Sequence, residues 1–326
     1  MKTILYYIPI FILIISIFSY FIFRKPKKKK KIRNYDYYNK LLPEEYEKEL
    51  KIWWKSRMKY DLDLKNPKDL NEKIQWLKIY DSTPLKTNLT DKYLFKDWVS
   101  KKFGKEYVIP LLGAWDSFSE IDFDKLPNKF LLKTNHASGW NYLVNNKSEL
   151  NLTILKNKFD RWMKLNFAFI NGLELHYLNI KPKIIAEEYH ENIEGDLFDY
   201  KAYCFDGRVE SIAFVSGKNK NRRIAFFDTK WNRLNYNDTY PIFEYDIPKP
   251  KNLDLLIKIC EKASKGFALV RVDLYILNDN SIKLGELTFT PTSGQLTFTP
   301  HEQIRIFGDM IKLPNKSPLP KRKKII

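Results

Sequence analysis

A stretch of alternating residues near the C-terminus constrains the fold of this 326-residue chain more than any other feature. Between Ala268 and Leu277, apolar residues alternate with polar ones, which is the period of a strand with one buried face. The next four residues, Asn278–Ser281, are turn residues, because Asn and Asp tolerate positive φ. A second apolar run, Ile282–Leu287, then returns. The pattern predicts an antiparallel hairpin with one buried and one polar face.

The polar face of this hairpin predicts a metal site. Whether the loop has two residues or four, the register is the same, with Asp273 opposite Glu286 and Arg271 opposite Thr288. Opposing Cβ atoms are about 5 Å apart, so the two carboxylates repel unless a cation lies between them. Oxygen ligands favour Mg²⁺ or Mn²⁺. The alternative is a pair of solvated edge carboxylates, although Gly285 beside Glu286 leaves room for a ligand to approach the backbone.

A second candidate site is a strand that ends on a lysine. The apolar run Phe130–Lys133 is followed by the small, polar residues Thr134–Asn141. Backbone N–H groups in such a loop can bind phosphate, and the Lys133 ammonium supplies a point charge. An ordinary turn between strands explains the same pattern, so the loop alone does not decide the function.

Three further polar groups follow along the chain. The apolar run Ile184–Tyr189 becomes charged before His190, and such a strand can offer backbone groups to a planar base. Asp199 and Lys201 lie on one side of the next strand, where the acid can bind a ribose hydroxyl and the lysine a phosphate. The pair Arg222–Arg223 can add a cation. Each group, taken alone, is better explained as a surface pair than as a site.

The order of elements predicts an α+β fold in which helices cover antiparallel sheets. Helices are predicted after Pro43 and at Leu70–Tyr80, Asp91–Phe103, Thr153–Phe167 and Leu253–Lys265. In addition to the hairpin, strands are predicted at Tyr107–Pro110, Phe130–Lys133, Ile184–Tyr189, Tyr200–Phe205, Val209–Val215 and Arg223–Phe227. The Pro- and Lys-rich tail after Pro314 is expected to be loosely held.

Composition excludes several classes of protein. A hydrophobic content of 44% excludes wholesale disorder, and two cysteines exclude a disulfide framework and a Cys-rich zinc site. The net charge of +18 is concentrated in two flanks, with eight basic residues between Arg24 and Arg33 and four at Lys321–Lys324. A net charge of +6 remains on the rest of the chain. Because the globular part is not strongly basic, no nucleic-acid partner is expected.

The N-terminus predicts a membrane anchor. Ile4–Phe23 is twenty residues without a charge, which as a helix spans roughly 30 Å. The basic cluster that follows places the rest of the chain in the cytosol by the positive-inside rule and suits anionic lipid headgroups. We therefore expect a single-pass membrane protein. A cleaved signal peptide, or a basic arm for nuclear import or RNA, is the alternative.

Taken together, these residues resemble the ATP-grasp superfamily, and more narrowly its teichuronopeptide-biosynthesis (TupA-like) family. The similar stretches are LNEKIQWLKIYD, DKYLFKDWVSKKFG, IPLLGAWDSFSEIDFDKLPNKFLLKTNHASG, IKPKIIAEEY, DYKAYCFDG and VRVDLYILNDNSIKLGELTFTPTSG. The resemblance covers about Leu70 to Pro314 and implies two α+β subdomains that grip ATP, whereas the membrane span and the lysine run lie outside it. Together with the predicted anchor, it gives the following organisation: transmembrane helix 4–23, basic juxtamembrane linker 24–40, helical region 41–105, ATP-grasp catalytic domain 106–314 and basic tail 315–326.

The resemblance also implies a role for each candidate residue. Phosphate binding falls to two lysines and a loop, Lys133, Lys201, Ser138 and Gly139. The backbones of Glu188 and His190 would read adenine, and Asp199 the ribose. Asp273, Glu286 and Thr288 would bind Mg²⁺ or Mn²⁺, and Arg271, with Lys133, would act on the transferred phosphoryl group. Two positions depart from the family pattern, namely Trp140 in place of a second loop glycine and Thr288 in place of an Asn ligand.

The implied activity is an ATP-dependent carboxylate–amine ligase that works through an acyl phosphate. The family context implies a carboxylate-bearing glycan or sugar and an amine as substrates, in surface polysaccharide biosynthesis. Two alternatives remain open at this point: a sugar phosphotransferase or glycosyltransferase acting on a glycan, and a non-enzymatic membrane adaptor with a degenerate nucleotide pocket.

Overall fold

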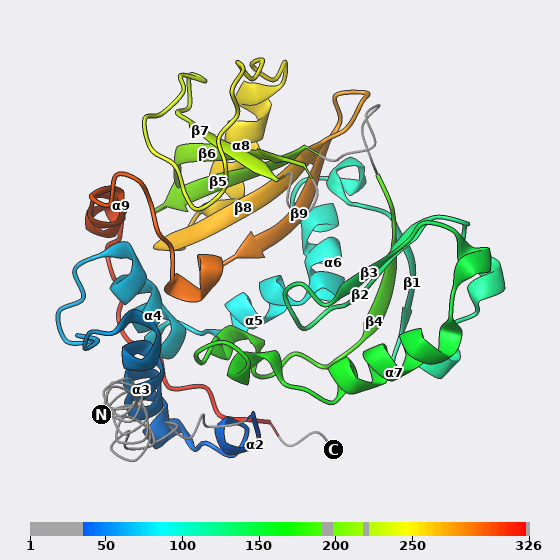
Figure 1. Cartoon of the computed structure of the whole chain (residues 1–326), viewed down its shortest axis with the longest axis horizontal. Helices are drawn as coiled ribbons and strands as arrows, with labels where there is room; N and C mark the ends of the chain where they lie inside the picture. The colour runs from blue at the N-terminus through cyan, green and yellow to red at the C-terminus, as the bar shows by residue number, and fades with distance from the viewer. Residues whose placement is uncertain (1–34, 191–197, 218–221, 324–326) are drawn as a thin grey trace, which may run out of the picture. The chain divides into compact units, whose positions relative to one another are not determined.

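The structure is a computed structural model that describes residues 35–190, 198–217 and 222–323. The chain divides into two compact units, Met1–Lys40 and Leu41–Ile326. Of the first unit, the described part holds one short helix, α2 (Tyr35–Tyr38). The second unit contains two antiparallel sheets with the helices that cover them, as drawn in Figure 1. The predicted α+β class is confirmed.

The first sheet has four strands in the order β1-β4-β2-β3. Their bounds are β1 (Leu111–Trp115), β2 (Phe130–Thr134), β3 (Asn141–Val144) and β4 (Ile184–Glu188). All three neighbouring pairs are antiparallel. One face of this sheet packs on helix α7 (Leu152–Met163), whose Leu155 and Phe159 join Phe130 and Leu132 in a buried cluster. The opposite face therefore carries the alternate residues, among them Lys133.

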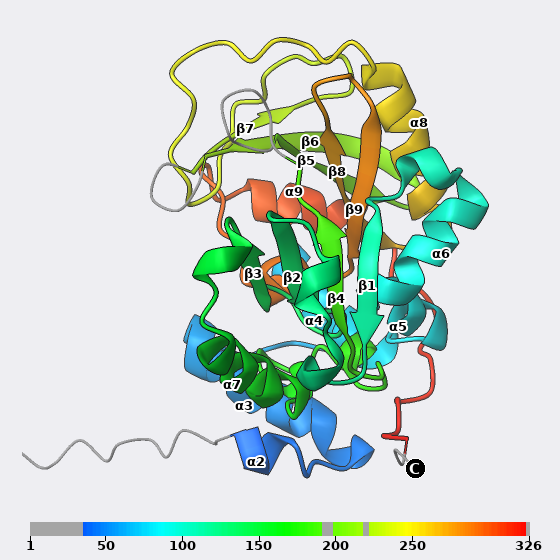
Figure 2. The ribbon, with the colours of Figure 1, turned by 90° about the vertical axis from the view of Figure 1, so that its right-hand side faces the viewer.

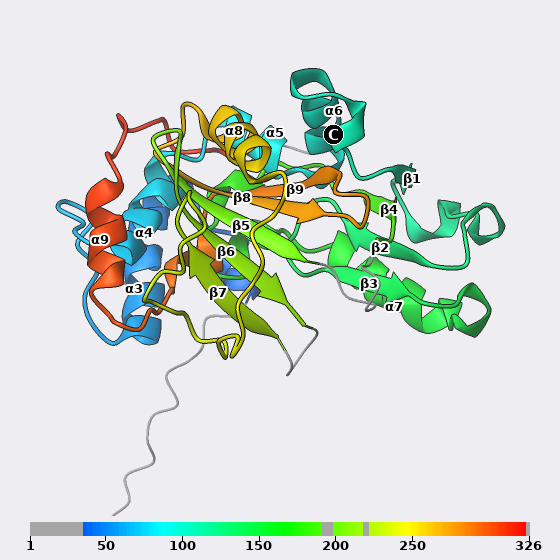
Figure 3. The same cartoon turned by 90° about the horizontal axis from the view of Figure 1, so that it is seen from above.

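The second sheet has five strands in the order β7-β6-β5-β8-β9, again all antiparallel. Their bounds are β5 (Asp199–Phe205), β6 (Arg208–Ser216), β7 (Arg223–Phe227), β8 (Leu269–Ile276) and β9 (Ile282–Thr288). Helix α8 (Leu253–Ser264) covers one face and forms the larger core with residues such as Ala202 and Val272. The other face presents Lys201, Arg271 and Asp273. In Figure 2 this sheet lies above the four-stranded sheet, and Figure 3 shows the two sheets side by side.

The remaining helices frame the two sheets. They are α3 (Tyr46–Met58), α4 (Leu70–Tyr80), α5 (Pro84–Thr90), α6 (Lys92–Lys102) and α9 (Gln303–Met310). Short 3-10 turns complete the fold at η2 (Pro43–Glu45), η3 (Lys105–Tyr107), η4 (Phe118–Glu120), η5 (Phe123–Lys125), η6 (Lys147–Glu149), η7 (Phe167–Phe169), η8 (Leu175–Tyr177) and η10 (Pro291–Gly294). Helix α6 begins where Asp91 caps it, its carboxylate accepting from the N–H groups of Tyr93 and Leu94. This cap fixes the direction in which the first turn of α6 points.

The predicted hairpin is present and its acids pair as predicted, but its loop length and its strand register next to the turn differ from the prediction. Asp273 pairs with Glu286 and Arg271 with Thr288, as predicted. The loop, however, has three residues rather than two or four, because the N–H of Leu277 donates to the carbonyl of Ser281. A bulge at Gly285 restores the register between the turn and the acids. The two errors in the prediction cancel, and the acids still face the same side.

The close approach at Gly285 explains why the bulge falls there. A Cβ at this position would lie 2.8 Å from the Tyr275 ring and 3.2 Å from the carbonyl oxygen of Asp273. Both contacts are shorter than ordinary van der Waals separations, so a side chain would push the two strands apart. The sequence pattern pointed to this glycine for its closeness to a ligand, whereas the structure shows that its own partner strand approaches it.

Three expectations need correction or remain outside the described residues. The predicted strand Tyr107–Pro110 is wrong: Lys105–Tyr107 is a 3-10 turn, and the strand begins after Pro110, which has no N–H to donate. The tail is not loosely held as far as Lys323. The N–H of Ser317 donates to Tyr80 O at 2.7 Å, and the side-chain Oδ1 of Asn179 accepts from the N–H of Lys323 at 2.9 Å. No helix of the described residues is long and apolar enough to cross a membrane, and the predicted span 4–23 lies outside them.

Candidate active site

A cavity of about 220 Å³ lies between the two sheets. The four-stranded sheet and its loops contribute Leu131, Lys133, Ser138, Gly139, Asn141, Glu187, Glu188, Tyr189 and His190. Helix α6 and the segment after it contribute Lys92 and Ile109, while the five-stranded sheet and its hairpin contribute Lys201, Asp273, Tyr275, Leu277, Lys283, Gly285 and Glu286. The candidate residues from distant parts of the sequence thus meet around one space.

On the side of the four-stranded sheet, two lysines share one buried carboxylate. Glu187 of β4, only 2% exposed, is 2.5 Å from the Nζ of Lys133 and 2.7 Å from the Nζ of Lys96. Burial acts to raise the pKa of Glu187, but the two ammonium charges outweigh it and hold that pKa below its usual value. The cluster carries an excess positive charge at the edge of the cavity. An anion is the ligand that such a charge favours.

On the side of the five-stranded sheet, acids and bases form one connected network. The buried carboxylate of Asp273 accepts from the Nε of Arg271 at 2.7 Å and from the Nζ of Lys201 at 2.8 Å. Lys201 also lies 2.5 Å from Asp199. Burial lowers the pKa of Lys201, but Asp273 and Asp199 act more strongly and raise it overall. Glu286, opposite Asp273 in the hairpin, and Lys283 of the same strand also line the cavity.

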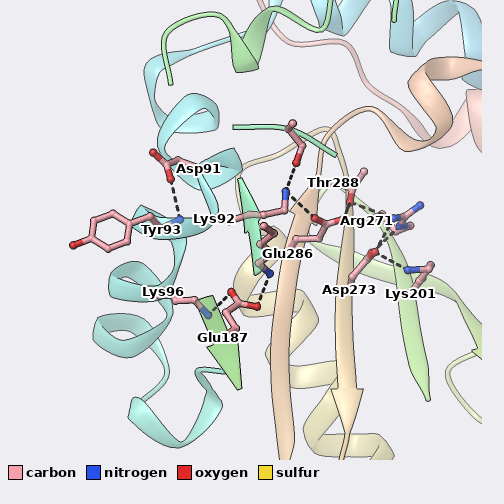
Figure 4. A network of polar contacts seen from close by, with 12 residues as sticks. Asp91, Lys92, Tyr93, Lys96, Glu187, Lys201, Arg271, Asp273, Glu286 and Thr288 are labelled. Atoms are coloured by element: carbon pink, nitrogen blue, oxygen red, sulfur yellow. Dashed lines mark hydrogen bonds and ion pairs between the residues drawn. The ribbon is translucent and has the colours of Figure 1, made fainter. Parts of the chain in front are cut away.

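Lys92 connects the two sides, as Figure 4 shows. It is the first residue of α6, and its ammonium donates to the carbonyl of Ala137 in the loop after β2 at 2.8 Å. The same nitrogen is 3.4 Å from the Oε2 of Glu286 on β9. Burial acts to raise the pKa of Glu286, yet Lys92, Arg271, Lys201 and other cations lower it to about 2. Glu286 is therefore ionised and available as a ligand at neutral pH.

Two of the predicted groups lie at other parts of the cavity wall. Ser138 and Gly139 line it from the loop between β2 and β3, where phosphate binding was predicted. Glu188 and His190 line it as well, as does Leu277 at the turn of the hairpin. The Nε2 of His190 is buried, makes no hydrogen bond to the described residues and lies 3.7 Å from the Oε2 of Glu188. A ring nitrogen without a hydrogen bond in the cavity wall is a position where a ligand group can bind.

Three predicted residues lie behind the wall instead of on it. Asp199, Arg271 and Thr288 do not line the cavity, although all three are bound to residues that do or to one another. The guanidinium of Arg271 donates to both oxygens of Asp273, and Arg271 is not among the residues that line the cavity. Thr288 donates to Glu286 and accepts from Arg271. In this arrangement Arg271 orients the acid rather than reaching into the space.

Three residues that the sequence analysis missed also belong to this site: Lys92, Lys96 and Glu187. Lys92 and Lys96 are one turn apart on α6, so both point to the same side. One signal was available for Lys92, because a lysine in the first turn of a helix opposes the helix dipole. Glu187 stood within a predicted strand but was not separated from Glu188. Only the pairing of β2 with β4 shows that it shares a face with Lys133.

The residues present fit Mg²⁺ together with a nucleoside triphosphate. Among the described residues, no three His, Cys, Asp or Glu side chains gather as a metal cage. Asp273 and Glu286 alone provide two carboxylates, which is how Mg²⁺ is usually held when phosphate oxygens and water complete its shell. Four lysines line the same cavity, and three of them, Lys92, Lys133 and Lys201, contact acids of the site and suit those phosphates. His190, whose Nε2 makes no hydrogen bond to the described residues, lines the same cavity.

A comparison with family models supplies the assignment. The model described as TupA-like ATPgrasp matches residues 72–312, nearly three quarters of the chain. The chain belongs to the TupA-like ATP-grasp family. The matched region contains every lining residue of the cavity, so the family's ATP-grasp α+β fold and the site described above belong to one unit.

Solved structures with a similar arrangement are distant. D-alanine–D-alanine ligase from Bacillus anthracis, complexed with ATP, is 16% identical with a TM-score of 0.44, over 69% of this chain and 65% of that chain. L-amino acid ligase from Bacillus licheniformis is 16% identical with a TM-score of 0.38, over 63% and 44%. N5-carboxyaminoimidazole synthase from Aspergillus clavatus is 13% identical with a TM-score of 0.37, over 62% and 44%. The matched part of this chain thus corresponds to about half of such enzymes. No curated protein matches the chain.

Proposed function

We propose that this TupA-like ATP-grasp protein is an ATP-dependent carboxylate–amine ligase that works through an acyl phosphate. One observation carries the proposal. A single cavity brings lysines from helix α6 and from both sheets, Lys92, Lys133 and Lys201, together with the facing acids Asp273 and Glu286. The lysines suit the phosphates of a nucleoside triphosphate, and the paired acids suit Mg²⁺.

In this proposal the lysines hold the phosphates of ATP. Lys133 can leave Glu187 for a phosphate oxygen because Lys96 stays 2.7 Å from that carboxylate and keeps its charge compensated. Lys92 can likewise turn from Glu286 to phosphate once Asp273 and Glu286 bind Mg²⁺. The metal, when bound, withdraws charge from the phosphates and makes the γ-phosphorus a better electrophile.

The chemistry then follows from positioning and charge compensation. An oxygen of the substrate carboxylate attacks the γ-phosphorus, the bond to the β–γ bridging oxygen breaks, and ADP leaves. The amine attacks the acyl carbon, phosphate departs with the electron pair of the C–O bond, and the ammonium proton passes to solvent. Arg271 positions Asp273 for this step through its two hydrogen bonds at 2.7 and 2.6 Å. The protein therefore acts mainly by orientation.

The cellular setting is a second part of the proposal. The uncharged segment 4–23 and the basic residues after it support a single-pass membrane anchor with the catalytic unit in the cytosol. The family resemblance supports a glycan or sugar carboxylate as substrate, in surface polysaccharide biosynthesis. A lipid-linked glycan at the inner leaflet would meet an enzyme anchored in this way.

The test is product formation by the full-length chain in a detergent without a sugar headgroup. D-glucuronate and D-galacturonate are supplied with Mg-ATP and with glycine, L-glutamate or ammonium, and products are identified by mass spectrometry. We expect ADP release that depends on both a carboxylate and an amine, and an amide product. The variant Asp273→Asn with Glu286→Gln is the matched negative control. A phosphosugar or a glycoside as the product, or full activity of the control variant, would contradict the proposal.

A further inference from the structure

Helix α4 carries a polar face that lies entirely in the interior. Asn71, Gln75 and Lys78 are 1%, 0% and 0% exposed. Their spacing of four and three residues puts them on one side of the helix. Buried polar side chains need partners, and a face of this kind on a helix is costly unless the partners are specific.

Most partners of this face belong to one short segment, Ser293–Leu296. The Asn71 amide both donates to Leu296 O and accepts from its N–H, at 2.8 and 2.9 Å. Gln75 donates to the carbonyls of Ser293 and Gly294, each at 3.1 Å. Lys78 donates to the carbonyl and hydroxyl oxygens of Ser293, both at 2.7 Å. Three side chains of one helix thus bind three residues of this segment, Ser293, Gly294 and Leu296.

The segment they hold begins with a strained turn. Thr292, Ser293 and Gly294 have φ values of 49°, 53° and 67°, three left-handed residues in a row. Each non-glycine residue in this region costs roughly 1–2 kcal/mol. A Cβ on Gly294 would lie 2.2 Å from the Nε2 of Gln75, so the turn is pressed directly against α4. Strain of this kind persists only where the surroundings determine it, and it marks functional segments.

The free-energy cost of burying the Lys78 ammonium argues that this lysine is not there to stabilise the fold. All four acceptors of its amine are neutral, the others being the Oε1 of Gln75 and the carbonyl of Gly172. Burial lowers the pKa of Lys78 to about 7, although the charge of Glu174 opposes this shift. An apolar residue would fill an interior helix position at lower cost. What the lysine provides is a fixed shape for the turn.

The place of the turn links it to the site. Strand β9 carries Glu286 and ends at Thr288, and the turn follows three residues later. Five residues separate the start of the turn, at Pro291, from Glu286, so it lies within about 18 Å of that acid. Leu277 lies at the other end of the hairpin from Thr288. His190 lies near that end too, because the charges of Lys283 and Asp279 act on it. The turn therefore lies beyond the acids, on the side away from the proposed base, where the substrate that receives the phosphoryl group must approach.

We propose that Lys78, with Gln75 and Asn71, is a positioning residue that fixes the left-handed turn Thr292–Gly294 as the rigid wall at the acceptor end of the site. The inference rests on the proposed ligase function for its catalytic meaning, and on the contacts of α4 for its structural content. It predicts that changes to the polar face of α4 alter the KM for the carboxylate substrate but do not alter the affinity for the nucleotide.

The experiment compares Lys78→Met with a matched control on the same helix. Lys73 also donates to two backbone carbonyls, those of Gly308 and Ile311, at 2.8 and 2.9 Å, but it does not contact the turn. Lys73→Met therefore removes an equivalent pair of bonds elsewhere. Ser293→Ala is a milder variant, which removes one hydroxyl and keeps the carbonyl that Lys78 binds. The full-length chain is used throughout.

Three readouts are measured on each variant. They are amide hydrogen exchange of Ser293, Gln295 and Leu296, affinity for Mg-AMPPNP, and hydroxamate formed from D-glucuronate, Mg-ATP and hydroxylamine, which traps an acyl phosphate. For Lys78→Met we expect at least tenfold faster exchange, at least a tenfold higher KM for D-glucuronate, and nucleotide affinity within twofold of wild type. Ser293→Ala should move the same readouts less, and Lys73→Met should move none of them.

The outcomes separate the two proposals. If Lys78→Met leaves exchange in the turn unchanged, or affects it no more than Lys73→Met does, the positioning role is wrong. An equal loss of nucleotide affinity and of D-glucuronate use would also contradict it, because that pattern indicates general damage. If the wild-type chain forms no hydroxamate and no amide with any carboxylate, the ligase proposal fails, and the exchange data still decide what Lys78 does.

Discussion

The two walls of the cavity solve the problem of burying charge in opposite ways. On the side of the four-stranded sheet, Lys133 of β2 and Lys96 of α6 surround the carboxylate of Glu187. On the five-stranded sheet, Lys201 and Arg271 are set among the carboxylates of Asp199, Asp273 and Glu286. The first cluster has a carboxylate at its centre, whereas the second has cations between carboxylates. A ligand that carries both phosphates and a metal can bind the first through a lysine and the second through its paired acids.

The comparison also gives Lys92 a distinct place. It touches the loop of the first wall through Ala137 and the acid of the second through Glu286. Neither wall alone would position it, because α6 belongs to the helical part of the chain. Changes to the two walls should therefore have different consequences, which we order from the largest expected effect to the smallest.

Removing an acid from the five-stranded wall should have the largest effect. In Asp273→Asn, Lys201 and Arg271 lose the charge they share, and the metal loses a carboxylate. We expect a loss of about 10²–10³-fold in kcat for ADP formation, the scale seen when one electrostatic group of an active site is removed. Asp97→Asn, which removes one partner of an exposed ion pair with Lys101, serves as the control and should be silent. Steady-state assays in which both variants behave alike would contradict this account.

Acid should weaken the four-stranded side first. Burial lowers the pKa of His136, in the loop after β2, to about 4 from its ordinary value of 6.5. Because the unfolded chain then binds the proton more readily than the folded one, stability is lost as the pH falls from about 6.5 toward 4. The loss should approach about 3 kcal/mol for this residue. Hydrogen exchange should show the loop around His136 opening at a higher pH than the hairpin, and His136→Gln should flatten the dependence.

The two lysines of the four-stranded wall should prove unequal. Lys133→Met leaves Glu187 paired with Lys96, so the fold should hold while Mg-AMPPNP binds about 10–100-fold more weakly, through loss of a charged hydrogen bond. Lys96→Met leaves Glu187 with Lys133 as its only partner, which holds that lysine back from phosphate, and a smaller loss of affinity is expected. Calorimetric titration of both variants distinguishes them. Equal affinities of the two variants for Mg-AMPPNP would contradict the different roles given to Lys133 and Lys96.

The bulge that aligns the acids gives the smallest predicted effect. A Cβ in Gly285→Ala would meet the Tyr275 ring at 2.8 Å, so the strands must separate slightly. We expect a loss of about 1–3 kcal/mol in the free energy of unfolding, typical of overpacking. The Mg²⁺ dependence of ADP formation should weaken with it, because Glu286 is the next residue. If chemical denaturation shows no change in the free energy of unfolding, the bulge at Gly285 does not align the acids in the way proposed.

The hairpin shows what the sequence can predict and where it stops. Alternation and turn residues were enough to place Asp273 opposite Glu286, because a strand's period is set by its backbone alone. The three-residue loop and the bulge at Gly285 were not predictable, since each depends on contact with the opposite strand. The three-residue loop shifts the register by one residue and the bulge shifts it back, so the predicted pairing holds only because both are present.

The lysines of α6 show the opposite case. Nothing in the local pattern distinguishes Lys92 and Lys96 from other lysines of an amphipathic helix, apart from the unfavourable helix end that Lys92 occupies. Their importance comes from how α6 packs beside β4 and β9, which is a tertiary fact. The polar face of α4 was hidden for the same reason, because a surface helix and a buried one that binds a turn have similar sequences.

The central claim is that Asp273 and Glu286 together hold a divalent metal against the phosphates of ATP. Binding of Mn²⁺, followed by its electron paramagnetic resonance signal in the presence and absence of AMPPNP, tests it most directly. We predict that the wild-type chain binds Mn²⁺ tightly only with the nucleotide, and that Asp273→Asn with Glu286→Gln abolishes this binding while the fold persists. Nucleotide-dependent Mn²⁺ binding that is unchanged in the double variant would contradict the account.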